Sequence, residues 1–95
     1  MPISTETLDG TTCVRIDGEL TIYTVAELAA ALLPQMGATP RLELDLSQVT
    51  EMDGAGLQLL AVVQREAGVA GTALSVTGQS QAVMHALQLC RSAGL

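Results

Sequence analysis

The segment Leu42–Leu60 constrains the fold of this chain more than any other part of the sequence. Its leucines at positions 42, 44 and 46 alternate with charged residues, which is the pattern of a strand with one buried and one exposed face. The turn signal Asp53-Gly54-Ala55-Gly56 follows, and an apolar run after it predicts a helix from Gly54 to about Ala67. The sequence therefore places an acid and two glycines where a strand passes directly into a helix.

A helix start of this kind can attract an anion or a docking partner, because its first backbone N–H groups lack partners within the helix. The surrounding sequence offers no general base, metal-ligand cluster or activated nucleophile. The single histidine, His85, has no cysteine or carboxylate at metal-ligand spacing, and Ser80 lies in no nucleophile elbow. We therefore expect a binding module and not an enzyme, with no metal site and no cofactor.

The first half of the chain predicts a hairpin and a helix. Ile3–Leu8 and Thr12–Asp17 have strand character, and the Asp9-Gly10 signal between them is typical of a hairpin turn. Thr24 to Glu27 matches a capping box, in which the hydroxyl and the carboxylate satisfy each other's backbone donors. We expect a helix from there until Pro34 and Gly37 end or kink it.

The second half predicts one more strand and one more helix. Ala73–Thr77 alternates as Arg41–Leu46 does, and Ser80 is placed to cap a helix from Gln81 to about Cys90. Strands covered by helices on both faces would be continuously apolar, so the alternation predicts helices on one face and an open polar face. The helix after Gly54 carries more apolar residues than one buried stripe requires, so either another element covers the excess or a partner does.

Composition excludes several classes of partner. The chain has 95 residues, which make one small domain spanning residues 1–95, and a net charge of −6 without any lysine. Its four arginines are scattered, whereas nucleic-acid binding needs a basic patch. We expect no nucleic-acid binding and no membrane insertion. Two cysteines, Cys13 and Cys90, and the absence of a signal-peptide pattern predict free thiols in a cytoplasmic protein.

Several phrases of the sequence together resemble the STAS family, the bacterial anti-sigma factor antagonists and their relatives. They are Gly18-Glu19-Leu20, Leu44–Val49, Met52–Leu57 and the ending Ala93-Gly94-Leu95. The resemblance implies an α/β fold, with a mixed sheet of about four strands and helices mainly on one face. It also implies a docking role without catalysis. Antagonists of this family bind a kinase-type anti-sigma factor. Other members sit beside chemotaxis-type kinases or form a small subunit of phospholipid-transport ABC complexes.

The chain departs from the family pattern at the position of the phosphorylation switch. Antagonists are switched at a Ser or Thr two residues after the motif aspartate, and here that position is Ala55. The nearest substitute hydroxyls are Thr50 and then Ser47. The family's last strand and helix also have no counterpart, so the fold is expected to be short at its C-terminus. A homodimer is one way to cover the resulting edge.

By this resemblance, the loop before the first helix lies beside the Asp53 turn, and together they form the expected docking surface. Two alternatives stay open from the residues alone: Asp53 simply caps the helix, and Tyr23 packs over the helix end. The expected partner is a kinase-type anti-sigma factor or a chemotaxis-type kinase, and the alternative role is the small STAS subunit of a phospholipid-transport complex. The predicted docking residues are Thr21, Tyr23, Thr24, Asp53, Gly54, Ala55, Gly56, Leu59, Val62 and Val63.

Overall fold

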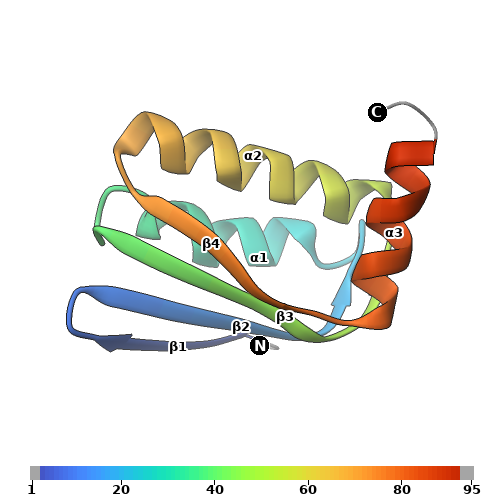
Figure 1. The fold of residues 1–95 in the computed structure, drawn as a ribbon, viewed down its shortest axis with the longest axis horizontal. Helices are drawn as coiled ribbons and strands as arrows, with labels where there is room; N and C mark the ends of the chain where they lie inside the picture. Colours follow the sequence, from blue (N-terminus) through green and yellow to red (C-terminus); the bar gives the residue numbers. More distant parts are fainter. Residues whose placement is uncertain (1–2, 93–95) are drawn as a thin grey trace.

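A computed structural model describes residues 3–92 as one four-stranded sheet with helices packed against it (Figure 1). The predicted mixed α/β fold is confirmed. The elements in chain order are β1 (Ile3–Leu8), β2 (Thr11–Leu20), α1 (Val25–Leu32), a 3-10 turn η1 (Leu33–Gln35), β3 (Arg41–Met52), α2 (Gly54–Ala70), β4 (Ala73–Gln79) and α3 (Gln81–Ser92).

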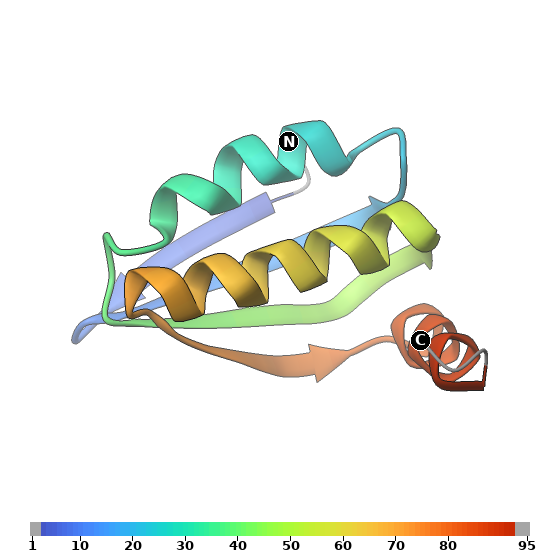
Figure 2. The ribbon, with the colours of Figure 1, turned by 90° about the horizontal axis from the view of Figure 1, so that it is seen from above.

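The strand order is β1-β2-β3-β4. β1 and β2 are antiparallel, while β2–β3 and β3–β4 are parallel pairs. Parallel neighbours need crossover connections, and α1 and α2 supply them on the same face of the sheet (Figure 2). α3 lies at the end of the sheet to which β3 runs (Figure 1). The opposite face of the sheet is open, as the alternating strands predict.

The core forms between the sheet and the two crossover helices. The three alternating leucines of β3, Leu42, Leu44 and Leu46, are all fully buried, and each such side chain contributes about 1.5–3 kcal/mol. The other fully buried large side chains come from β2, α1, α2 and α3: Val14, Ile16, Leu20, Leu28, Leu32, Val63 and Val83.

The predicted hairpin is confirmed, and so is one predicted cap. Asp9 and Gly10 both have positive φ, at 52° and 78°, which suits a two-residue turn between twisted antiparallel strands. Ser80 accepts a hydrogen bond from the N–H of Val83 at 3.2 Å and so caps α3.

The capping box predicted at Thr24 is wrong. The Thr24 side chain makes no cap for α1. Instead its hydroxyl accepts from the N–H of Thr21 at 3.0 Å and lies 3.0 Å from the carbonyl of Glu19. A tight turn, in which the N–H of Thr24 donates to the carbonyl of Thr21 at 2.9 Å, directs the hydroxyl back into the loop.

Several element boundaries differ from the sequence prediction, and those of β3 and α2 bear on the site. β3 continues past Leu46 to Met52 and delivers Asp53 directly to α2. α2 continues past about Ala67, its predicted end, through Gly68 and stops at Ala70. Gly71 takes the left-handed conformation, with φ 79°, that commonly ends a helix, whereas Gly68 stays helical at a modest cost in propensity.

Neither Cys13 nor Cys90 takes part in a disulfide. None of the helices within residues 3–92 has the length and apolar character to cross a bilayer. The ending Ala93-Gly94-Leu95, which contributes to the family resemblance, lies outside the described residues.

Candidate functional site

Asp53 connects two parts of the chain that are distant in sequence. It is the N-cap of α2, and its Oδ1 accepts from the N–H of Gly56 at 3.1 Å. Its Oδ2 accepts from the N–H of Ile22 at 3.0 Å, and its own N–H donates to the carbonyl of Leu20 at 3.4 Å. The predicted cap is therefore present, and the same carboxylate also fixes the loop between β2 and α1. We call Asp53–Gly56 together with the loop Thr21–Thr24 the Asp53 corner.

The Asp53 corner contains a negatively charged carboxylate, so it is not an empty anion-binding site. The Ile22 N–H lowers the pKa of Asp53, burial opposes that shift, and the N–H groups of Gly56 and Ala55 add to the lowering. A carboxylate so stabilised stays ionised at neutral pH and interacts favourably with the positive end of the α2 dipole. Because Asp53 already occupies the helix start, a phosphate there would meet a fixed negative charge.

Gly56 lets α2 approach β2 closely. A Cβ at this position would collide with the backbone carbonyl of Leu20, whereas a Cβ at Gly54 would meet open space. The sequence has small residues at this junction, and small residues allow a strand and a helix to approach closely. Which of them is sterically required becomes visible only when the end of β2 is in place.

The loop at the corner presents two large side chains to solvent. Ile22 is 62% exposed and Tyr23 is 88% exposed. The alternative in which Tyr23 packs over the helix end is therefore excluded. Beneath them the loop backbone is held by hydrogen bonds, including Thr21 N–H to Thr24 Oγ1 and Ile22 N–H to Asp53 Oδ2, each at 3.0 Å. The loop therefore holds two exposed apolar side chains in a fixed position next to Asp53.

An apolar groove of about 340 Å³ runs from this loop between α1 and α2. We call it the α1–α2 groove. Its one polar side chain is Gln58, and its lining brings two predicted docking residues, Leu59 and Val62, beside Ala55. The lining residues are Ile22, Val25, Ala26, Ala29, Leu33, Ala55, Gln58, Leu59 and Val62.

A second groove, of about 280 Å³, lies on the other side of Asp53, between the start of α2 and α3. The sequence alone does not predict this groove. His85 and Leu89 are four residues apart on α3 and so share one helix face, which is the signal that could have indicated it. We call it the α2–α3 groove. Its lining is Met52, Asp53, Gly54, Leu57, His85, Ala86, Leu89 and Cys90.

Some predicted docking residues support this surface from below. Thr21, Gly56 and Val63 are buried, and Leu59 is only 7% exposed at the bottom of the α1–α2 groove. The surface available to a partner is formed by Ile22 and Tyr23, with Gly54, Ala55 and Val62.

The two substitute hydroxyls, Thr50 and Ser47, are exposed on β3. The N–H of Ser47 donates to Asp45 Oδ1 at 2.9 Å. Hydrogen bonds from the Ser47 side chain and backbone lower the pKa of Asp45. Neither hydroxyl belongs to the Asp53 corner, because both precede the end of β3.

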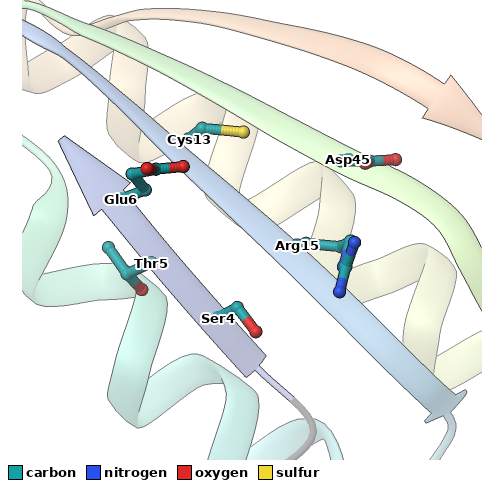
Figure 3. Close-up of a pocket in the computed structure, with 6 residues that line it drawn as sticks. All are labelled: Ser4, Thr5, Glu6, Cys13, Arg15 and Asp45. Carbon is teal, nitrogen blue, oxygen red and sulfur yellow. The ribbon is translucent and has the colours of Figure 1, made fainter. Parts of the chain in front are cut away.

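The open face of the sheet holds a polar hollow of about 430 Å³ (Figure 3). Arg15 is its single basic side chain, and Arg15 pairs with Asp17 at 3.7 Å. Within residues 3–92, no three His, Cys, Asp or Glu side chains are placed to hold a metal ion. The hollow is lined by Ser4, Thr5, Glu6, Cys13, Arg15 and Asp45.

Comparison with known proteins finds the same fold in several bacterial proteins. A family model described as "Mlab, STAS domain" matches residues 3–95. An anti-sigma factor antagonist from Mycobacterium paratuberculosis is 25% identical with a TM-score of 0.82, and the match covers 97% of this chain and 79% of that one. SpoIIAA in its unphosphorylated form is 20% identical with a TM-score of 0.76, covering 94% of this chain and 80% of that one.

A third similar structure is much longer than this chain. Mglu is 18% identical with a TM-score of 0.73, and the match covers 82% of this chain but only 20% of Mglu. At that identity the likeness shows a shared fold.

Proposed function

This chain belongs to the STAS domain family, and from that membership we propose that it is a non-enzymatic signalling module that docks onto a partner protein through the Asp53 corner. One observation carries the proposal. Asp53 holds the N–H of Ile22 and the N–H of Gly56 with its two carboxylate oxygens. The exposed Ile22 and Tyr23 are thereby fixed beside an apolar groove.

The chemistry of this surface suits a protein partner. Exposed aromatic and aliphatic side chains beside a groove are typical of the central anchors of interfaces. A loop already ordered by hydrogen bonds loses little conformational entropy on binding. The chain's charge of −6 favours a partner whose docking region is basic, since complementary charges accelerate association.

The partner class that we propose is a kinase-type regulator, either an anti-sigma factor or a chemotaxis-type kinase, which would place the protein in the cytoplasm. Support comes from the likeness to an anti-sigma factor antagonist over 97% of this chain. In that setting Ala55 is decisive. A phosphate would add about −1.5 to −2 charges beside Asp53, but Ala55 has no hydroxyl to receive it. We therefore propose that docking is constitutive.

A phosphorylation assay tests the constitutive part of the proposal. The full chain and Ala55→Ser are each incubated with the kinase-type anti-sigma factors of the same organism and ATP, and intact masses are measured. Ala55→Ser should gain one phosphate and the natural chain none. Ala61→Ser, which adds a hydroxyl at an exposed position further along α2, is the matched control and should gain none. A phosphate on Thr50 or Ser47 of the natural chain would contradict constitutive docking.

A binding assay with the same regulators tests the surface itself. Tyr23→Ala removes a side chain that is 88% exposed, so it should weaken binding about tenfold or more while the melting temperature stays nearly unchanged. Leu8→Ala, which truncates a side chain that is 72% exposed at the end of β1, is the control and should leave affinity intact. Unchanged affinity of Tyr23→Ala would contradict the proposed docking surface.

The α2–α3 groove favours a second candidate function, the small STAS subunit of a phospholipid-transport ABC complex. Leu89 on that groove is 57% exposed and Met84 on the same helix is 47% exposed, which suits a permanent interface. In this role the absence of a hydroxyl at Ala55 would not impair function, because no phosphorylation switch is needed. Purification distinguishes the two candidate functions. A protein that is soluble when expressed alone supports the signalling role. Solubility only with a co-expressed ATP-binding subunit supports the transport complex.

A further inference from the structure

The outer edge of β4 is a second surface, separate from the Asp53 corner. β4 is the last strand of the sheet within residues 3–92, so no other strand there pairs with its outer edge, and α3 lies past its end (Figure 2). The N–H of Ala73 donates to the carbonyl of Pro40 at 2.9 Å and so faces the interior of the sheet. Because backbone groups alternate along a strand, those of Leu74 and Val76 point outward, where another strand could pair with them.

The Ala73–Val76 part of this edge lacks the usual protection against pairing. Proteins commonly guard an edge strand with charged residues, proline or a bulge. β4 reads ALSVTGQ, without charge or proline. Its register against β3 is regular from Ala73 to Val76 and shifts only after that point. The opposite edge, β1, carries Glu6 and leads into Asp9.

The apolar face of β4 is also incompletely covered. Leu74 and Val76 lie on the helix-facing side but are only partly buried, whereas Leu42 and Leu44, their partners on β3, are fully buried. Val69, four residues before β4 on α2, is 80% exposed. Apolar side chains therefore flank a row of backbone groups that have no strand partner among the described residues.

We propose that β4 pairs in antiparallel fashion with β4 of a second copy of this chain, joining two sheets into one. A two-fold axis beside Ser75 would set Leu74 of one copy opposite Val76 of the other, as a hydrogen-bonded pair of apolar residues. The outward backbone groups of both residues would then be satisfied. A second copy of the chain is the favoured partner for this edge, because the edge is self-complementary and uncharged.

Charge argues for this edge over other ways of joining two copies. Each copy carries −6, so most shared surfaces would set carboxylates against carboxylates. In the proposed register, the symmetry-related carboxylates nearest the two-fold axis are those of Glu43 in the two copies, because Glu43 lies next to Ser75 on β3. Three strand spacings of about 4.8 Å separate them, which exceeds the Debye length of about 8 Å at physiological salt.

The oligomeric state as a function of concentration tests this proposal. Sedimentation velocity should show the natural chain shifting from 9.8 kDa to twice that mass as concentration rises. Ser75→Lys sets two ammonium groups against each other at the two-fold axis and should remain monomeric. Ser4→Lys makes the same charge change at an exposed serine on the β1 edge and should dimerise normally. Circular dichroism confirms that both variants fold.

Amide hydrogen exchange locates the interface. The N–H groups of Leu74 and Val76 should exchange more slowly as the natural chain dimerises and should remain fast in Ser75→Lys. A natural chain that stays monomeric at every attainable concentration would overturn the proposal and leave the edge to another partner. A dimer that survives Ser75→Lys, or that forms without slowing these two amides, would overturn it as well.

Discussion

Gly56 is the residue whose substitution should damage the Asp53 corner most directly. A methyl group there would collide with the carbonyl of Leu20, and backbone cannot move aside as a flexible side chain can. We expect Gly56→Ala to lower the free energy of unfolding by about 1–3 kcal/mol, the usual cost of overpacking. Urea unfolding measures it. Gly54→Ala, two residues earlier at the same helix start and in open space, should be neutral or slightly stabilising. Equal stability of the two variants would contradict this reading of the junction.

Asp53 should make stability depend on pH in one direction. The Ile22 N–H, together with those of Gly56 and Ala55, lowers its pKa in the folded state. A carboxyl whose folded pKa lies below its unfolded value stabilises the fold above the unfolded value, about 3.9, and loses that contribution as pH falls through the folded value. Asp53→Asn should therefore be less stable than the natural chain at pH 7, and the gap should narrow on acidification. Unfolding curves that stay equally separated between neutral and acidic pH would refute this.

The sequence predicts the hydrogen bond by which Asp53 caps its own helix, but it does not predict the bond from Asp53 to the distant loop. An aspartate before a glycine-containing helix start predicts a cap, and the bond to the Gly56 N–H is that cap. The second bond joins residues 31 positions apart, and no local pattern reports such a pairing. Likewise, small residues predict close packing at this junction, but only the position of Leu20 distinguishes Gly56 from Gly54.

At the scale of elements, the two glycines near the end of α2 should respond in opposite directions to the same substitution. Gly68 is helical and exposed with open space around it, so Gly68→Ala should stabilise the protein by about 0.5–1 kcal/mol. Gly71 has φ 79° at the helix end, where a Cβ is strained, so Gly71→Ala should destabilise it by about 1 kcal/mol. Thermal unfolding of both variants measures this. A stabilised Gly71→Ala would show that the helix can end without the left-handed residue.

The capping box at Thr24 and the end of α2 show why the boundaries of elements are difficult to predict from sequence. Thr24 and Glu27 have the right spacing, yet the tight turn through Thr21 commits the hydroxyl to the loop. Gly68 and Gly71 are equally plausible stops. Gly71 takes the left-handed conformation, and the buried Thr72 that follows it donates to the carbonyl of Thr39 at 2.9 Å, which fixes the point where the chain leaves α2. Local signals establish that an element exists, whereas tertiary packing sets its limits.

At the scale of the whole molecule, the covering of one sheet face by helices could be predicted, whereas the α2–α3 groove and the exposure of Tyr23 could not. Alternation in β3 and the following apolar helix are strong periodic signals, and they predict a sheet covered on one face. The α2–α3 groove depends on the direction in which α3 leaves β4, and the exposure of Tyr23 depends on a turn held from Glu19 and Asp53. Such features arise from the meeting of distant segments, so they require coordinates.

The charge of the whole molecule gives the last prediction. Ten acids oppose four arginines, and the two ion pairs found within residues 3–92, Arg15–Asp17 and Arg65–Glu66, are both largely exposed and contribute little. Repulsion among carboxylates therefore outweighs attraction, and screening should stabilise the fold. Raising NaCl from about 10 mM to 150 mM should increase the free energy of unfolding by on the order of 0.5 kcal/mol, or about 2–4 °C in Tm. Glu6→Gln, which removes one exposed acid from the open sheet face, should reduce this salt dependence. A Tm that falls with added NaCl would mean that ion pairs, and not repulsion, dominate the electrostatics of the fold.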